Sequence, residues 1–372
     1  MPDPRYRIED TGEIFTPALI VFRELLEQNL DAMIRIAGRP DRLRPHCKTH
    51  KIAEIAQLEL ARGIVKHKCA TLAEAEMLAR AGVRDIFLAY NLVGPNLGRA
   101  VRLLQSYPGV RVAVTADHPR PVAALGQAMR EAGLSIDVLL DIDTGMHRTG
   151  IEVGPQALAL YRQIAGTPGL QSGGLHVYDG QHQQSALAER SAAVHASWAR
   201  VVPFRDQLRA AGLPVPRIVA GGTGTFPVYA AIDDPTLELS PGTTVFYDAG
   251  YTDAFPDLPF QAAAVLLTRV VSRPGTDRVT VDLGSKACAA DPPAGRRLVF
   301  PELPEAEQVL QNEEHLILKT PRAEQFQPGD ELLAIPRHIC PTTALHKQVY
   351  VVSGGRLVGR WDVAARDRCL TI

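Results

Sequence analysis

Short apolar runs alternate with stretches of helical periodicity from residue 16 to about residue 250. In residues 96–105 the apolar positions recur three and four apart, which predicts a helix, and Pro95 stands where a first turn tolerates proline. Thr71 and Glu74 have the spacing of a capping box and predict the start of a second helix. Pro155 opens a third periodic stretch.

Eight candidate strands lie between these helical stretches, and several are nearly continuous apolar runs, typical of strands buried on both faces of a parallel sheet. The eight are Leu43–Cys47, Ile64–Ala70, Asp85–Ala89, Val110–Thr115, Ile136–Asp141, Gln171–Val177, Arg217–Ala220 and Thr236–Leu239. Strands and helices in this order predict an α/β fold, a (β/α)8 TIM-type barrel over residues 16–254. An open doubly wound sheet is the alternative.

After about Phe255 helical periodicity becomes scarce, and strand-like runs follow one another between Pro/Gly turns. The tripeptide 353–355, Ser-Gly-Gly, separates two such runs and predicts a hairpin. We therefore expect a second, antiparallel β domain over residues 255–372, joined by the N-terminal residues 1–15.

Composition and charge narrow the range of functions. Apolar residues make up 46% of the chain, and 40 basic against 41 acidic residues give a net charge of −1. This balance argues against a general grip on nucleic acid or an anionic membrane. There is no long uncharged apolar stretch and no signal-peptide core, and the five cysteines are scattered. We expect a cytoplasmic protein without a disulfide framework.

The chemically conspicuous residues follow the predicted strands, where a barrel places its active site. The first strand runs into Pro-His-Cys-Lys-Thr-His-Lys at 45–51, which contains His46 and Lys48. A lysine in a barrel mouth is desolvated, so its pKa falls and its amine can attack a carbonyl. The alternative is a solvated basic turn.

The fifth and sixth strands end in segments that contain Arg148 and, further on, Tyr178 and His182. Arginine at a strand end can hold an oxyanion or a phosphate, although an ion pair on a surface loop is equally compatible. Tyr178 and His182 could transfer protons or pack beside a flat cofactor. His176, taken alone, is better explained as a hydrogen-bonded core histidine.

Glycine-rich loops follow the seventh and eighth strands. Gly222, Thr223 and Gly224 lie in the first loop, and Gly242 and Thr243 in the second. Barrels frequently bind phosphate with these two loops, through backbone N–H groups and hydroxyls. A phosphate site together with a lysine at a strand end suggests pyridoxal phosphate.

In the second domain, His338 and Cys340 form a His-x-Cys pair, which an extended segment would place on one face. Imidazole and thiolate suit zinc or a similar divalent ion, and two ligands leave positions open for water or substrate. Such a pair can also be incidental. His315 is a further polar candidate.

Together these motifs resemble the fold-type III pyridoxal-phosphate enzymes of the D-threonine aldolase and D-serine dehydratase family, relatives of alanine racemase. The resemblance spans nearly the whole chain. It implies Lys48 as the Schiff-base lysine, Arg148 near the cofactor, and the two glycine loops around the phosphate. It also implies His338 and Cys340 as ligands of Zn, Mn or Co, and a homodimer.

Two residues point to different reactions within this family. Cys340 resembles the dehydratases, whereas Tyr178 resembles the aldolases. We expect a lyase acting on D-3-hydroxy amino acids, with retro-aldol cleavage to glycine and an aldehyde favoured. Dehydration to a 2-oxo acid and ammonia is the alternative. The base could be His46, His182 or a metal-bound hydroxide. Other readings are an amino-acid racemase, a pyridoxal-phosphate carrier and a zinc hydrolase.

Overall fold

The structure is a computed structural model that describes residues 3–369 and residue 371. Residues 1–2, 370 and 372, which belong to the predicted β domain, lie outside this description. The chain divides into two compact units. One takes in Met1–Met33, Thr49–Ile52 and Thr243–Arg366, and the other takes in the remainder. Within the described residues, no helix is long and apolar enough to span a membrane.

The second of these units is built on a seven-stranded parallel sheet whose strands follow one another in chain order. The strands are β2 (Lys66–Cys69), β3 (Asp85–Asn91), β4 (Arg111–Ala116), β5 (Ile136–Asp141), β6 (Leu170–Val177), β7 (Ile218–Ala220) and β8 (Leu237–Leu239). Each coincides with one of the predicted strands to within a few residues. The α/β prediction with a parallel sheet is confirmed.

The first predicted strand is reduced to two isolated bridges. Leu43 pairs in parallel with Leu239 of β8, and His46 pairs in parallel with Lys68 of β2. This segment therefore joins the first and last strands of the sheet and closes the ring. Pro45 has no N–H to donate, which shortens the ladder to these two contacts.

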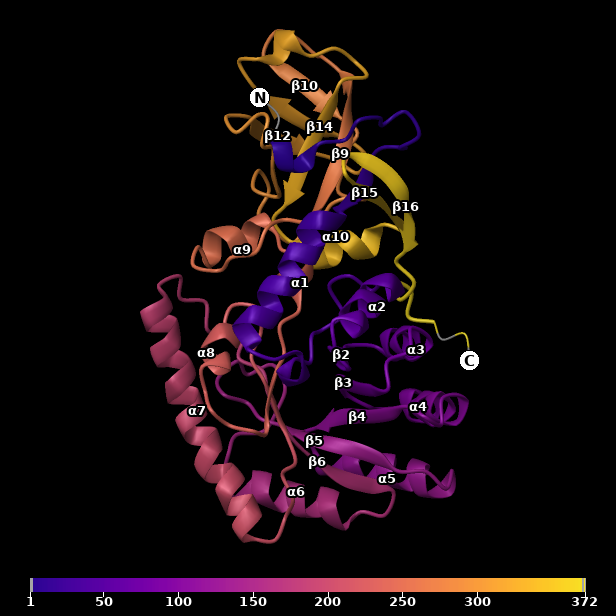
Figure 1. Cartoon of the computed structure of the whole chain (residues 1–372), viewed down its shortest axis with the longest axis vertical. Coiled ribbons are helices and arrows are strands. Elements are labelled where there is room, and N and C mark those ends of the chain that lie inside the picture. The colour runs from indigo at the N-terminus through magenta and orange to yellow at the C-terminus, as the bar shows by residue number, and fades with distance from the viewer. Residues whose placement is uncertain (1–2, 370, 372) are drawn as a thin grey trace. The chain divides into compact units, whose positions relative to one another are not determined.

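Helices connect the strands and lie outside the sheet (Figure 1). They are α2 (Ala53–Ala61), α3 (Leu72–Arg80), α4 (Asn96–Ser106), α5 (Pro119–Glu131), α6 (Pro155–Gly166), α7 (Leu187–Ala210) and α8 (Phe226–Ala230). The capping prediction is confirmed, because the Thr71 hydroxyl accepts the N–H of Glu74 at 3.1 Å. The Glu74 carboxylate reaches back to the N–H of Ala70 at 2.6 Å, one residue earlier than in a regular capping box.

Side chains fill the interior of the ring in layers, as in other barrels of this kind. At the amino end of the strands, Arg44 bonds to Glu238 at 2.5 Å and to Asp85 at 2.7 Å, and Lys66 bonds to Glu238 at 3.0 Å. An apolar layer follows, formed by Phe87, Ala113, Leu139 and Val219. Polar side chains occupy the carboxyl end, where the chemistry is expected.

The other unit contains a nine-stranded sheet that is mostly antiparallel. Its strands are β1 (Ala18–Phe22), β9 (Ala264–Ser272), β10 (Arg278–Val281), β11 (Leu298–Val299), β12 (Glu307–Gln311), β13 (Leu316–Lys319), β14 (Glu331–Pro336), β15 (Gln348–Ser353) and β16 (Arg356–Asp362). β15 and β16 form the predicted hairpin. Two short helices, α9 (Ala249–Ala254) and α10 (Ile339–Leu345), were not predicted.

Strand β1 lies in this sheet, parallel to β15 and antiparallel to β9. The predicted barrel began at residue 16, so β1 corrects that assignment: an apolar ALIVF run does not say which sheet it joins. The helix that follows it, α1 (Arg23–Ala37), crosses the division between the units.

Candidate functional site

The segment that closes the ring holds Lys48 beside β2. The N–H of Cys47 donates to the carbonyl of Lys68 at 2.9 Å, and the N–H of Lys68 donates to Pro45 at 2.8 Å. The N–H of Lys48 in turn donates to Nδ1 of His46 at 3.3 Å. These bonds fix the backbone before Lys48 while its side chain stays half-buried at the carboxyl end of the ring.

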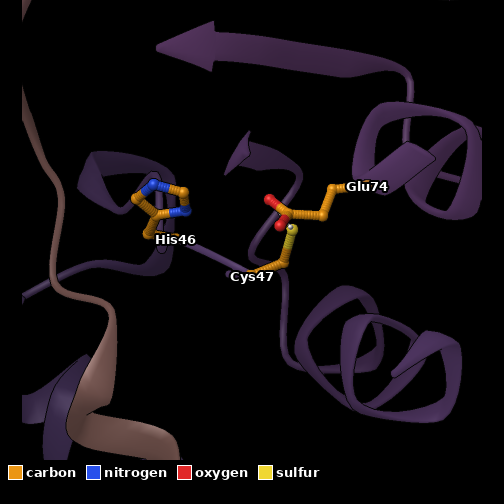
Figure 2. Close-up of side chains that lie close together, drawn as sticks. All are labelled: His46, Cys47 and Glu74. Atoms are coloured by element: carbon orange, nitrogen blue, oxygen red, sulfur yellow. Dashed lines mark hydrogen bonds between the residues drawn. The ribbon is translucent and has the colours of Figure 1, made fainter. Parts of the chain in front are cut away.

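Next to Lys48, the side chains of His46, Cys47 and Glu74 bring one nitrogen, sulfur and oxygen within 4.8 Å of one another. Figure 2 shows the thiol and the imidazole both turned towards the Glu74 carboxylate. No other such group of three metal-ligating side chains is found in residues 3–369 and 371. Because His46 accepts the N–H of Lys48 and Glu74 accepts the Cys47 thiol at 3.8 Å, these residues also anchor the loop that carries Lys48.

Strands β5 and β6 end in a buried pair. Nδ1 of His176 lies 2.7 Å from the Asp141 carboxylate, and the two residues are direct neighbours in the sheet register. Nε2 of His176 is buried with no hydrogen-bond partner. Burial, and then the nearby Lys68, hold the pKa of His176 below its usual value against the opposing effect of Asp141. His176 is therefore a neutral imidazole with an unused nitrogen.

Two cationic side chains lie against the ring of Tyr178. The guanidinium carbon of Arg148 lies 4.9 Å from the ring centroid, and the amine of Lys68 lies 5.6 Å from it. Lys68 is only 3% exposed. Burial, and then the charge of Lys48, lower the pKa of Lys68 to about 7. Lys48, Lys68 and Arg148 thus place a concentration of positive charge at this end of the ring.

The two glycine loops are joined to each other and to the end of β6. The N–H of Gly242 donates to the Thr223 hydroxyl at 3.3 Å, which connects the loops after β7 and β8. The N–H of Gly222 donates to Thr225, whose hydroxyl donates to Asp179 at 2.8 Å. A Cβ at Gly222 would lie 3.2 Å from the Tyr178 ring, so glycine permits this close approach.

These observations fit an anionic, flat cofactor such as pyridoxal phosphate. The cations have few acidic partners, and several polar atoms at this end are buried without a hydrogen bond, among them Nε2 of His176 and Oγ of Ser240. Orphaned buried polar atoms are costly unless a ligand or water completes their bonds. Seven of the predicted cofactor residues lie in the barrel unit: Lys48, Arg148, Tyr178, Gly222, Thr223, Gly224 and Gly242. The eighth, Thr243, is the first residue of the segment Thr243–Arg366, which belongs to the β unit.

His338 and Cys340 lie in that other unit, at the start of α10. His338 is the N-cap residue and Cys340 lies in the first turn, so the prediction of an extended segment was wrong. Pro341 in the first helical turn was a signal for this start. Hydrogen bonding to Cys340, and then to Asp291, raises the pKa of His338 to about 9 despite burial. His338 therefore has both a thiol and a carboxylate as neighbours, although the three side chains do not meet as closely as those of His46, Cys47 and Glu74.

Three further contacts position this helix start. The Cys340 sulfur lies 3.2 Å from the Thr49 hydroxyl and 3.6 Å from the Thr243 hydroxyl. Asp248 is fully buried, and its carboxylate accepts the N–H of Ile339 at 3.0 Å. The donor set of nitrogen, sulfur and oxygen fits zinc or another divalent ion of similar preference.

His182 and His315 lie in less revealing surroundings. Nε2 of His182 lies 2.9 Å from the Ser197 hydroxyl on α7, and His315 is exposed in the turn between β12 and β13. The sequence analysis missed Lys68, Asp179 and Asp291. The end of β2, which follows the strand-end rule used for Lys48, was a signal for Lys68, whereas Asp291 stands in a Pro/Gly loop without any pattern.

Comparisons with known proteins find relatives over nearly the whole chain. The family model for the alanine racemase N-terminal domain matches residues 23–249, and a serine dehydratase domain matches residues 263–352. A D-threonine aldolase from Arthrobacter sp. is 33% identical over 98% of this chain and 96% of its own length. A D-threo-3-hydroxyaspartate dehydratase from Delftia sp. is 28% identical over 93% and 96%.

Solved structures give the same picture. The crystal structure of D-threonine aldolase from Filomicrobium marinum superposes with a TM-score of 0.88 at 31% identity, covering 95% of this chain and 96% of that one. An alanine racemase from Clostridium difficile superposes with a TM-score of 0.73 at 12% identity over 94% and 100%, a likeness of fold alone.

Proposed function

Because this chain belongs to the D-threonine aldolase and D-serine dehydratase family of fold-type III pyridoxal-phosphate enzymes, we propose that it cleaves D-3-hydroxy amino acids between Cα and Cβ. The products are glycine and an aldehyde, and D-threonine is the model substrate. The observation that carries this choice is Tyr178, the residue that resembles the aldolases, which lies against Arg148 and Lys68 in the cluster that fits the cofactor.

Bound pyridoxal phosphate supplies an aldehyde for the amine of Lys48 and a ring that takes up the electrons released at Cα. In the proposal Lys48 holds the cofactor, the loops at Gly222–Gly224 and Gly242 hold its phosphate, and Arg148 and Tyr178 hold its ring. The bonds from His46 and Lys68 would hold the backbone at Lys48 in place while its amine carries the cofactor.

We propose His338 and Cys340 as the metal ligands, with Asp291 fixing the imidazole of His338 or binding alongside it. A divalent ion makes a bound 3-hydroxyl more acidic, which favours its deprotonation and the cleavage of the neighbouring bond. Zinc is expected to bind tightly because of the thiolate, while manganese or cobalt could also serve.

Dehydration to a 2-oxo acid and ammonia is the second candidate. It is favoured by Cys340, the residue that resembles the dehydratases, and by the similarity to the Delftia dehydratase. The two reactions differ in which bond at Cα is aligned for breaking, so the ligands alone do not decide between them.

The test is a product assay. The purified protein is incubated with D-threonine, pyridoxal phosphate and either zinc or manganese, and both product pairs are quantified. Acetaldehyde with glycine is the expected result. L-Threonine and the Lys48→Ala variant serve as controls and should give background values. Formation of ammonia and 2-oxobutanoate instead would establish the dehydratase, and the absence of both pairs would reject D-threonine as a substrate.

A further inference from the structure

Lys68 is a buried amine whose charge is not balanced in the protein. It is 3% exposed, and no hydrogen bond or ion pair of its side chain is found in residues 3–369 and 371; its amine lies 5.6 Å from the centroid of the Tyr178 ring. Lys66, two residues earlier on the same strand, bonds to Glu238 at 3.0 Å. The two lysines thus differ in having or lacking an acidic partner.

The acids nearest to Lys68 are engaged elsewhere. Asp141 binds His176, and one oxygen of Asp179 accepts the Thr225 hydroxyl. Both carboxylates favour a charged Lys68 from a distance, while Lys48 and Arg148 oppose it. A buried ammonium in this position is costly unless an anion completes the site.

The Lys68 side chain belongs to the same end of the ring as Lys48. The backbone bonds between Lys68, Pro45 and Cys47 bring these two strand ends together. Tyr178, Arg148 and Lys48 are also the residues that the proposed function assigns to the cofactor. An anion bound against them would therefore reach the amine of Lys68.

We propose that Lys68 is a further cofactor-binding residue, whose amine pairs with an anionic oxygen of pyridoxal phosphate. The inference rests on the proposed function, since it presumes that this cofactor occupies the cluster. Charge pairing with the cofactor supplies the partner that the protein itself lacks and tightens cofactor binding without any role in bond breaking.

The test measures cofactor binding in the absence of substrate. Pyridoxine 5′-phosphate, which lacks the aldehyde and cannot react with Lys48, is titrated into protein freed of cofactor by calorimetry. The variant Lys68→Met should raise the dissociation constant about tenfold or more, as expected for loss of a charge-assisted hydrogen bond. If Lys68 pairs with the ring oxygen, the absorbance maximum of bound pyridoxal phosphate should shift as well.

Unphosphorylated pyridoxine distinguishes the two anionic groups of the cofactor. If Lys68→Met weakens pyridoxine and pyridoxine 5′-phosphate equally, Lys68 pairs with the ring oxygen. If it weakens only the phosphorylated compound, Lys68 pairs with the phosphate. Either result supports the proposal.

Lys66→Met is the matched control, because it makes the same change on the same strand but at the amino end of the ring. It should leave the dissociation constant and the absorbance unchanged. Thermal unfolding reports folding separately: cofactor-free Lys68→Met should unfold no earlier than the wild type, and its stabilisation by cofactor should be smaller.

An unaltered dissociation constant and absorbance in Lys68→Met would overturn the inference and leave Lys68 a structural residue. Failure of the proposed function would be seen differently, because the wild-type protein itself would then show neither binding of pyridoxine 5′-phosphate nor the absorbance of bound pyridoxal phosphate.

Discussion

At the scale of single residues, the buried carboxyl group of Asp179 has an unusual environment. Asp179 is fully buried, bonds to Thr225 through one oxygen, and has a second oxygen without a partner. Burial raises the pKa of Asp179 from its usual 3.8 to about 6, although hydrogen bonds and the charge of Lys68 act in the opposite direction. The folded protein therefore retains a proton that the unfolded chain has lost over this range.

This difference predicts a pH dependence of stability. Between about pH 4 and pH 6 the folded state binds more protons than the unfolded state at Asp179, so raising the pH through this window lowers the free energy of unfolding. We expect the melting temperature of cofactor-free wild type to fall more than that of Asp179→Asn between pH 4 and pH 7. The exposed Asp233→Asn serves as a control that should follow the wild type. Parallel curves for Asp179→Asn and wild type would contradict the assignment.

Residues placed by a local rule were predictable, and residues placed by distant parts of the chain were not. Lys48, Arg148, Tyr178 and the glycine loops follow strands, and a parallel barrel brings such ends together whatever the helices between them. His338 and Asp291 are 47 positions apart, so only the folded β unit could reveal their contact.

At the level of elements, the first segment of the ring is held more by charge than by a strand ladder. Its two bridges involve Leu43 and His46, while Arg44 between them is 1% exposed and pairs with Asp85 of β3 and Glu238 of β8. The apolar runs predicted the strand order, but they did not predict this buried network. Nothing in the local sequence around Arg44 indicates that its side chain is buried.

Removal of one member of such a network leaves the others uncompensated. Arg44→Met should lower the free energy of unfolding by about 3–5 kcal/mol, because Asp85 loses its partner and Glu238 retains only Lys66. Arg44→Lys keeps the charge but not the guanidinium geometry that bonds to both Asp85 and Glu238, so it should lower the free energy of unfolding by less than Arg44→Met. Urea unfolding followed by circular dichroism measures both. A loss below about 1 kcal/mol for Arg44→Met would show that the pairs behave like exposed ones.

At the level of the whole molecule, the two proposed chemical groups belong to different compact units. Lys48 and the glycine loops through Gly242 fall in the barrel unit, and His338 with Cys340 falls in the β unit. In the proposed function, bond breaking needs both groups, whereas cofactor retention draws on the barrel residues. The two properties should therefore be separable by a change confined to one unit.

We accordingly expect chelation, or the variant His338→Ala, to reduce turnover of D-threonine at least a hundredfold while the absorbance of the bound cofactor persists. The reason is that loss of the metal removes several kcal/mol of charge stabilisation at the 3-hydroxyl but none of the residues proposed to hold the cofactor. His195→Ala, an exposed histidine on α7, is the matched control and should retain activity. Turnover and absorbance are recorded on the same samples, before and after zinc or manganese is restored. Full activity after exhaustive metal removal would reject the metal site, and simultaneous loss of cofactor would reject the separation of the two roles.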